Sequence, residues 1–292
     1  MQTLHRALDL GVNFFDTADV YGDGHSERLL ARLRKERREP FWIATKVGRR
    51  LNPHVARGYT RENLTPYVER CLRNLEVEAL DLVQIHCPPT DVYYMPEVFG
   101  VFDDLVKAGK VRNYGVSIER IEEGLKALEY PQVQSLQVIF NVMRQRPAEL
   151  LFPRAIERKV GILARLPLSS GMLTGKLTRA TQFHHDDHRS FNREGAAFDR
   201  GETFSGFDYD KSLVIVEKLR ALLPEGMTLP ELALRFIASF PAVTCSIPGA
   251  RRPEQVEQNV KAAREGGLDA GLLQALTALY DSEVKPFVHQ LW

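Results

Sequence analysis

The segment Val12-Asn13-Phe14-Phe15-Asp16 is a short, mostly apolar run that ends in one polar side chain, and three later segments repeat this arrangement. They run from Trp42 to Lys46, from Leu82 to His86 and from Tyr114 to Ser117. Buried parallel strands have continuous apolar sequences of this kind, and the carboxyl ends of the strands of a (β/α)8 barrel converge on one mouth. The sequence therefore predicts an α/β protein with a (β/α)8 TIM barrel fold and polar residues gathered at its mouth.

A segment with helical periodicity follows each of these runs, which favours a parallel sheet with helical crossovers. The predicted strands begin at Asn13, Trp42, Leu80, Val111, Ser135, Gly161 and Val243, and the predicted helices cover residues 2–10, 26–34, 60–75, 95–108, 119–128, 150–158, 209–223, 230–240, 253–263 and 268–280. Seven strands are identifiable, whereas a closed barrel of this type has eight. Because a first strand would normally precede helix 2–10, we expect a single barrel domain over residues 1–292 that lacks its N-terminal strand.

Composition limits the classes of partner. The 39 basic and 38 acidic residues give a formal net charge of +1, so charge gives no reason to expect nucleic acid or an anionic membrane surface as a partner. The first residues lack the apolar stretch of a signal peptide, and no apolar run approaches the roughly 18 residues of a spanning helix. Three cysteines without a Cys-x-x-Cys pair favour a reducing compartment. We therefore expect a cytoplasmic protein without a membrane span.

Residues 181–207 form a long polar stretch that contains the run His184-His185-Asp186-Asp187-His188. Loops of this length in a compact domain are usually functional or disordered. A metal site is one interpretation, but consecutive loop residues seldom converge on one ion. We expect no metal here and interpret the stretch as a flexible flap over the barrel mouth.

The side chains expected at the mouth are suited to proton transfer. An ammonium beside a phenol favours the phenolate, so Lys46 would enable Tyr21 to act as a general acid. Asp16 would keep Lys46 charged, and a neutral His86 could donate a hydrogen bond to a carbonyl oxygen that becomes an alkoxide. This set suits carbonyl reduction, and because no protein side chain donates hydride, a nicotinamide or flavin cofactor is required.

Each residue also has an ordinary structural interpretation. Asp16 could be a turn residue, Lys46 a solvated strand end and His86 a hydrogen-bonded core histidine, although three such coincidences at strand ends are harder to explain. The glycine-rich stretches at residues 22–24 and 171–177 match neither the dinucleotide fingerprint nor the phosphate loop. A nicotinamide nucleotide would therefore bind at the barrel mouth.

The ordered motifs resemble those of the aldo-keto reductase family over nearly the whole chain. They are Asp16-Thr17-Ala18-Asp19-Val20-Tyr21-Gly22 with Gly24-His25-Ser26-Glu27, Ala44-Thr45-Lys46, Asp81-Leu82-Val83-Gln84-Ile85-His86, Gly115-Val116-Ser117 and Ile247-Pro248-Gly249-Ala250-Arg251. The resemblance implies reversible, NADPH-dependent reduction of aldehydes or ketones. It also implies that Tyr21 is the general acid, Lys46 assists it, Asp16 holds Lys46 and His86 orients the carbonyl.

The same resemblance implies the cofactor contacts. Ser117 and Gln137 match positions that bind the carboxamide, although Ile118 stands where the family often has Asn. Arg165 stands where many members stack a Tyr on the nicotinamide; a planar guanidinium could take that role or form a salt bridge at the mouth. The segment that folds over the pyrophosphate is matched by Pro167, Leu168, Ser170, Gly171 and Lys176.

Adenosine recognition is implied near the helix that follows Pro253, where free N–H groups favour phosphate. Gly249 replaces a Lys found in some members, which leaves Arg251 as the cation for a ribose phosphate, with Arg252 as the alternative. Gln255 and Gln258 stand where Arg and Glu are often found, and Asn259 matches the family. We therefore expect NADPH as the cofactor.

Two other functions remain open at this point. A desolvated Lys46 could attack a carbonyl in a Schiff-base aldolase, and some relatives resemble reductases but act as non-catalytic NADPH-binding regulatory subunits. The expected partner is a small-molecule carbonyl compound, and the sequence sets no oligomeric state. Strand alternation predicts that Cys87 packs behind its strand, turned away from the mouth.

Overall fold

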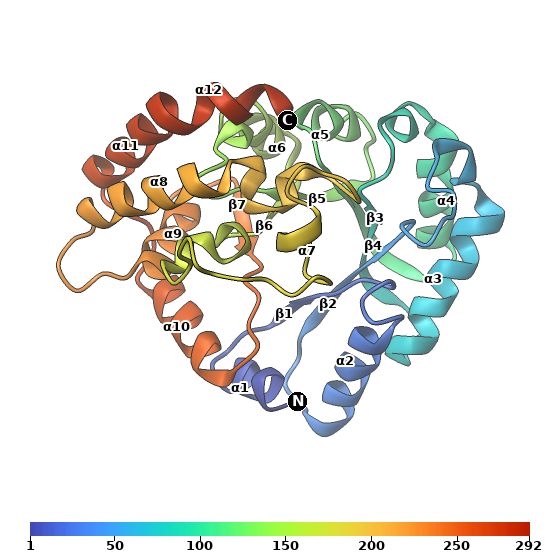
Figure 1. The fold of residues 1–292 in the computed structure, drawn as a ribbon. Helices are drawn as coiled ribbons and strands as arrows, with labels where there is room; N and C mark the ends of the chain where they lie inside the picture. Colours follow the sequence, from blue (N-terminus) through green and yellow to red (C-terminus); the bar gives the residue numbers. More distant parts are fainter.

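The computed structural model describes residues 1–292 and contains one sheet of seven parallel strands in the order of the chain. The strands are β1 (Phe14–Asp16), β2 (Trp42–Val47), β3 (Leu80–His86), β4 (Val111–Ser117), β5 (Val133–Ile139), β6 (Gly161–Arg165) and β7 (Val243–Ser246). The sheet curls into a barrel wall with the helices outside it (Figure 1). The predicted barrel with seven strands is confirmed, and the strands begin within two residues of the predicted positions.

Twelve α-helices cover or extend this wall (Figure 1). They are α1 (Gln2–Asp9), α2 (His25–Glu36), α3 (Arg61–Leu75), α4 (Pro96–Lys107), α5 (Ile121–Ala127), α6 (Leu151–Arg158), α7 (His188–Phe191), α8 (Tyr209–Ala221), α9 (Leu229–Ala238), α10 (Pro253–Arg264), α11 (Ala270–Leu279) and α12 (Lys285–Val288). None of these helices is both long and apolar enough to cross a membrane.

Apolar side chains on the two faces of the sheet form separate clusters, as expected for strands buried on both sides. The larger cluster, of 61 buried residues, lies mainly between the sheet and the helices. The smaller cluster contains Ala44, Leu82 and Leu163, against which Phe14 and Cys245 pack. Because those five residues come from strands distributed around the wall, this cluster fills the barrel interior.

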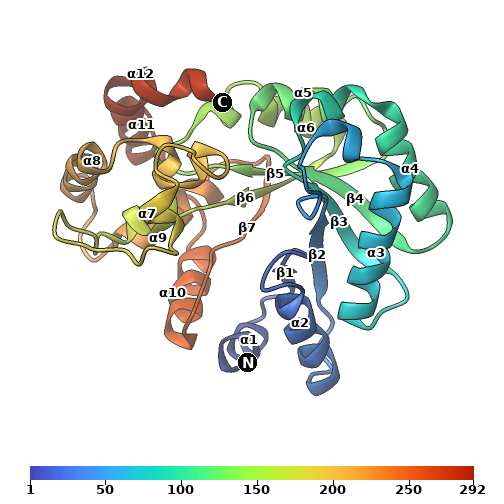
Figure 2. The same cartoon turned by 45° about the vertical axis from the view of Figure 1, so that its right-hand side comes forward.

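The wall is not continuous, because β1 and β7 do not pair with each other. A largely apolar cavity of about 700 Å³ lies between them and includes Asp16, Gly249 and Asn259 among its lining residues. The ring of helices nevertheless closes on the outer side, where α1 lies beside α10 (Figure 2). Arg6 pairs with Glu257 at 2.7 Å, and Arg264 donates to the carbonyl oxygen of Leu10 at 3.1 Å. The open sheet expected from the sequence is therefore bridged by its helices.

The predicted loop at residues 181–207 contains α7 and two single-turn helices, Arg200–Glu202 and Phe204–Gly206. Asn192 is buried, and its side-chain oxygen accepts the backbone N–H groups of Ala197 and Phe198 at 2.9 and 3.0 Å. We call residues 181–207 the flap. Its residue Glu202 contacts Arg49, just after β2, and Arg165, at the end of β6. The mobility of the flap stays a prediction.

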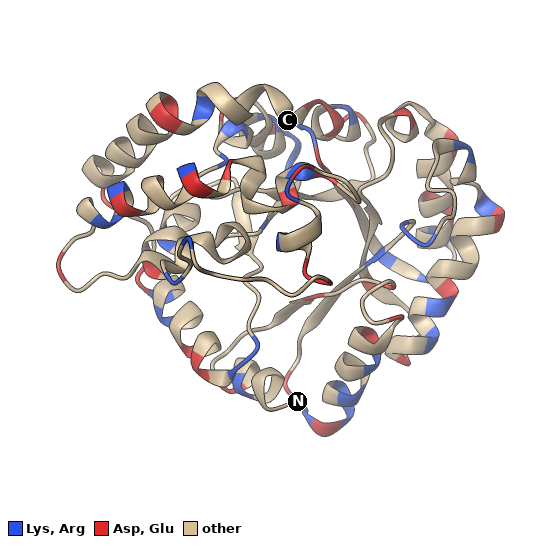
Figure 3. Cartoon of the chain, viewed as in Figure 1, with Lys and Arg blue, Asp and Glu red and all other residues tan.

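Positions of Lys and Arg (blue) and of Asp and Glu (red) are interspersed along the ring of helices, as the coloured ribbon in Figure 3 shows. This distribution matches the near-zero net charge of the sequence.

Candidate active site

Three neighbouring strands deliver the predicted catalytic residues to one end of the barrel. Asp16 is the last residue of β1, Lys46 lies near the end of β2 and His86 is the last residue of β3. Parallel pairing aligns these ends, since Asp16 lies opposite Ala44 and Lys46 opposite Gln84. Tyr21 follows in a turn after β1, where its N–H donates to the carbonyl oxygen of Ala18 at 3.1 Å.

Lys46 is the buried cation of this group, with its side chain 1% exposed. Its ammonium pairs with the Asp16 carboxylate and donates to the carbonyl oxygen of Thr17 at 2.8 Å. Burial is the largest influence and acts to lower the pKa of Lys46, but the Asp16 carboxylate and the Tyr21 phenol together outweigh it and raise the pKa above its ordinary value. Lys46 is therefore charged, which suits electrostatic support and is unfavourable for nucleophilic attack.

Tyr21 and His86 lie beside this ammonium. The two rings are 6.1 Å apart between centroids in an edge-to-face arrangement, and Lys46 Nζ lies 5.2 Å from the centroid of the Tyr21 ring. Tyr21 is 45% exposed and therefore accessible from solvent, whereas His86 is buried. Burial, followed by the charges of Lys46 and Arg49, holds the pKa of His86 well below its usual range. A neutral imidazole that can donate a hydrogen bond thus lies near the phenol at neutral pH.

A chain of side-chain amides connects the catalytic carboxylate to the barrel interior. Gln137 Nε2 donates to Asp16 Oδ2 at 2.7 Å and to Gln84 Oε1 at 2.9 Å. Gln84 Nε2 in turn donates to Ser135 Oγ at 3.2 Å. The sequence analysis missed Gln84, although it stands two residues before His86 and so shares the inward face of β3. These contacts orient both amides, with the Gln137 nitrogen toward Asp16 and the Gln84 oxygen toward Gln137.

The two predicted carboxamide-binding residues lie at the ends of neighbouring strands. Ser117 closes β4 and Gln137 lies within β5, paired directly with Ser117 in the sheet. Both side chains are buried, and Ser117 Oγ lies 3.4 Å from Cys87 Sγ. The structure thus brings them to the same end of the barrel as Asp16 and His86.

Arg165 ends β6 and forms a salt bridge at the barrel mouth, one of the two roles considered from the sequence. Its Nη1 lies 3.2 Å from Glu202 Oε1, and its Nη2 donates to the carbonyl oxygen of Ile118 at 3.2 Å. Its Nη2 also lies 3.8 Å from Cys87 Sγ. The expectation that Cys87 packs behind its strand is wrong, because its φ of 42° interrupts the strand alternation. Its thiol instead lies among charged groups at the mouth.

The predicted pyrophosphate segment follows β6 in an unusual backbone conformation. Positive φ angles occur at Leu166 (55°), Ser169 (45°), Ser170 (55°) and Gly171 (94°). Such angles are uncommon outside glycine and often mark ligand-binding segments. Pro167 and Leu168 lie between these residues, and Lys176 is exposed just beyond the 3-10 segment Ser169–Thr174, whose backbone is non-helical at Ser170 and Gly171. Ser170 Oγ donates to the carbonyl oxygen of Glu202 at 2.7 Å, which connects this segment to the flap.

The predicted adenosine residues surround the start of α10. Gln255 Oε1 accepts the backbone N–H groups of Arg251 and Arg252 at 2.8 and 3.1 Å, so this oxygen caps the helix. Arg251 and Gln258 are exposed, whereas Gly249 and Asn259 line the cavity between β1 and β7. The two arginines at a helix N-terminus form a local positive site, which suits a phosphate.

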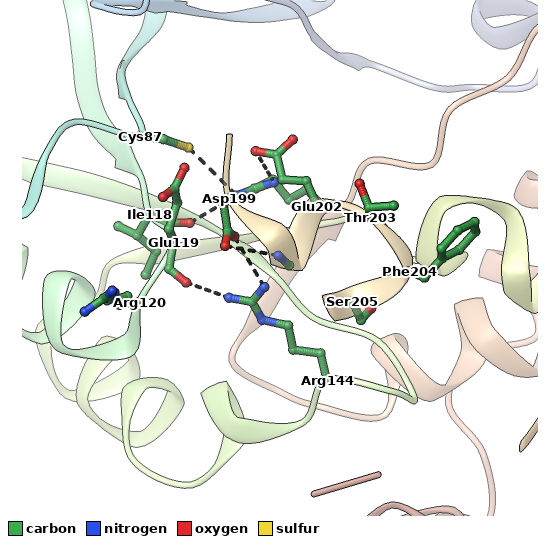
Figure 4. Close-up of polar contacts among 12 residues, drawn as sticks. Cys87, Ile118, Glu119, Arg120, Arg144, Asp199, Glu202, Thr203, Phe204 and Ser205 are labelled. Atoms are coloured by element: carbon green, nitrogen blue, oxygen red, sulfur yellow. Dashed lines mark hydrogen bonds and ion pairs between the residues drawn. The ribbon is translucent and has the colours of Figure 1, made fainter. Parts of the chain in front are cut away.

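A group of charged residues, which we call the mouth cluster, lies where the flap meets the barrel end, and Figure 4 labels Glu119, Arg144, Asp199 and Glu202 among them. It contains Arg49, Glu119, Arg144, Arg165, Asp199 and Glu202. Arg144 is fully buried, lies 3.7 Å from Asp199 and donates to the carbonyl oxygen of Glu119 at 2.5 Å. Burial and the neighbouring Asp199 raise the pKa of Glu119 to about 7. The sequence did not predict this cluster, because Asp199 and Glu202 lie in the flap, whose sequence has no strand or helix periodicity that would place them.

The histidine run on the flap is a group of potential metal ligands. Ligand atoms of His184, His185 and Asp186 lie within 4.8 Å of one another, and all three residues are exposed. Two of these contacts are ion pairs between Asp186 and the histidines. The prediction that no metal binds here stays a prediction.

Comparison with known proteins identifies the class. Residues 1–281 match the model of the Aldo/keto reductase family, so the chain belongs to this family of oxidoreductases. Aldo-keto reductase YhdN of Bacillus subtilis is 30% identical over 262 residues, covering 88% of this chain and 76% of the relative. Aldo-keto reductase yakc [NADP(+)] of Schizosaccharomyces pombe is 26% identical over 291 residues, covering 96% of this chain and 82% of the relative.

A solved structure supports the same assignment. The glycerol dehydrogenase AKR11B4 from Gluconobacter oxydans superposes with a TM-score of 0.79 at 28% identity, covering 97% of this chain and 85% of that chain. The fold class inferred from the four strand ends is therefore confirmed by the architecture and by the family match.

Proposed function

We propose that this protein reduces aldehydes or ketones to alcohols, reversibly, with NADPH as the hydride donor. The observation that carries the proposal is the cluster of Tyr21, Lys46, Asp16 and His86 at one end of the barrel, with the ammonium buried and paired. Two similar proteins support it, since the name of one includes NADP(+) and the other is a glycerol dehydrogenase.

The proposed chemistry assigns one role to each side chain. When bound, NADPH would supply a hydride to the carbonyl carbon. The Tyr21 hydroxyl would donate its proton to the carbonyl oxygen, and the Lys46 ammonium would stabilise the resulting phenolate. His86, neutral because its pKa is low, would donate a hydrogen bond to the same oxygen. Asp16 would keep Lys46 charged throughout the step.

The residues present fit a nicotinamide dinucleotide phosphate. Ser117 and Gln137 would hold the carboxamide, since they end neighbouring strands at the mouth. The left-handed backbone of Ser169, Ser170 and Gly171 would lie along the pyrophosphate. The exposed Arg251 at the start of α10, with Gln255, Gln258 and Asn259 on that helix, would recognise the ribose phosphate and adenine.

The decisive experiment measures NADPH oxidation with a simple aromatic aldehyde by the loss of the cofactor's near-ultraviolet absorbance. Tyr21→Phe is expected to lower kcat by about 10²-fold or more, the usual contribution of a general acid. Tyr67→Phe, on α3, is the matched control and should retain the wild-type rate. A loss of less than about tenfold for Tyr21→Phe would contradict the proposal.

Two other outcomes would favour the remaining functions. Tight NADPH binding without turnover of any aldehyde would support a regulatory subunit. Borohydride trapping of substrate carbon on Lys46 would support an aldolase, a role that the ion pair with Asp16 makes unfavourable.

A further inference from the structure

The carboxylate of Glu202 occupies a position between two guanidinium groups of the barrel end. Glu202 Oε1 lies 3.2 Å from Arg165 Nη1 and 3.6 Å from Arg49 Nη2. Arg165 ends β6 and Arg49 follows β2, so both guanidinium groups belong to the barrel. Glu202 belongs to the flap, which brings its carboxylate to these two arginines (Figure 4 labels Glu202). Both arginine side chains are at least four-fifths buried.

The flap supplies most of the negative charge in the mouth cluster. The barrel contributes Arg49, Arg144 and Arg165 but only one carboxylate, Glu119, whereas the flap contributes Asp199 and Glu202. Glu119 has its pKa raised to about 7, so it is partly protonated at neutral pH. Arg49 Nη2 also lies 2.7 Å from Glu119 Oε1, so with Glu202 neutralised Arg49 keeps one carboxylate neighbour, whereas Arg165 loses its ion-pair partner. A carboxylate bound beside Arg165 would replace the lost charge.

This charge lies close to the proposed site of reduction. Arg165 Nη2 lies 3.8 Å from the thiol of Cys87, the residue after His86, and Arg165 Nη1 lies 3.2 Å from Glu202. Burial, Lys46, Arg49 and Arg165 all act to lower the pKa of His86. A substituent that extends from a carbonyl beside His86 toward Cys87 would approach Arg165 and its partner Glu202.

We propose that Glu202 is a specificity-determining residue that excludes carboxylate-bearing carbonyl compounds by occupying the Arg49–Arg165 pair. The inference rests on the proposed function and adds the substrate class, namely uncharged aldehydes and ketones. An anionic substrate would meet the like charge of Glu202, whereas removal of that charge would turn the same pair into a carboxylate site. Discrimination by a repelling group of this kind is an established route to specificity.

The test compares two isosteric substrates, 4-nitrobenzaldehyde and 4-carboxybenzaldehyde, which differ in net charge. Glu202→Gln keeps the size of the side chain and is expected to change the ratio of kcat/KM values by at least about tenfold in favour of the carboxylate. Glu194→Gln, on the same flap but exposed and paired with Arg200 at 3.3 Å, is the control and should keep the wild-type ratio. Adding Arg49→Gln to Glu202→Gln should reverse the gain.

The outcomes separate this inference from the proposed function. An unchanged ratio in Glu202→Gln, with both substrates reduced, would overturn the inference and leave the reductase intact. If the wild type reduces neither aldehyde, benzoate serves as a probe of the pocket in thermal unfolding. A larger rise in Tm with benzoate for Glu202→Gln than for the wild type would support the guanidinium pair as a carboxylate site, and an equal rise would overturn it.

Discussion

Gln137 Nε2 lies 2.7 Å from Asp16 Oδ2, so the Asp16 carboxylate is held between an amide from β5 and the ammonium of Lys46 from β2. The first oxygen of Asp16 pairs with Lys46 and the second accepts from Gln137. Because both oxygens are engaged from opposite parts of the wall, the carboxylate has a fixed orientation. The position of the Lys46 ammonium beside Tyr21 depends on this orientation.

The Asp16–Lys46 pair should show strong energetic coupling. Lys46→Met leaves a carboxylate in a largely buried place without its cation, and removing one partner of a buried pair costs about 3–5 kcal/mol of stability. In the double variant Asp16→Asn/Lys46→Met no unpaired charge remains, so we expect it to be less destabilised than the sum of the single variants. Urea unfolding of the four proteins measures the coupling, and additive effects would disprove it.

Asp19 should make stability depend on pH. Its carboxylate is buried without a side-chain partner, and burial together with the charge of Glu27 raises its pKa to about 7. Since an aspartate in the unfolded chain has an ordinary pKa of 3.8, Asp19 binds its proton more tightly in the folded state. Its stabilising effect is present at acidic pH and is lost as the pH rises to about 7.

Asp19→Asn mimics the protonated acid and should remove this dependence. Near pH 4 the Tm of the variant is expected to match that of the wild type. Between about pH 4 and about pH 7 the variant should exceed the wild type by a growing amount, and above about pH 7 the difference in Tm should stay constant. Thermal unfolding across this range, with the exposed Asp91→Asn as control, measures the difference. A Tm difference that does not change with pH would contradict the assignment.

Two glycines should respond oppositely to alanine. A Cβ at Gly115 in β4 would lie 2.2 Å from Ser135 Oγ and 2.3 Å from the Ser135 carbonyl oxygen, so backbone would have to move. Gly115→Ala is expected to cost about 1–3 kcal/mol. Gly100 in α4 has no atom within 4 Å of such a Cβ, and Gly100→Ala should stabilise by about 0.5–1 kcal/mol. Urea unfolding distinguishes the two, and equal effects would exclude close packing of β4 on β5 as the cause.

The strands, and the grouping of the four proposed catalytic residues at one end of the barrel, could be predicted because their signals are local. Each strand is a short apolar run, and Asp16, Lys46 and His86 stand at or near the ends of three of them. The parallel arrangement then brings these ends together without further information. The inward position of Gln84 could have been predicted in the same way, since strand alternation places its side chain on the same face of β3 as that of His86.

The mouth cluster could not be predicted, because it depends on the path of the flap. Glu202 pairs with Arg165, 37 positions earlier, and with Arg49, in the turn after β2, and nothing in the polar composition of the flap indicates these partners. Cys87 shows a second limit, since alternation holds only while the backbone stays extended. A single positive φ angle at that residue turned its thiol toward the charged groups.

The cavity between β1 and β7 separates the two halves of the proposed cofactor path. No backbone hydrogen bonds join the strand that carries Asp16 to the strand that leads to Gly249. Their mechanical coupling passes instead through α1 and α10, where the Arg6–Glu257 pair is more than one-third exposed. Exposed pairs of this kind weaken as dissolved salt increases. Rising ionic strength is therefore expected to weaken one of the contacts that hold α1 against α10, the helix proposed to bind the ribose phosphate.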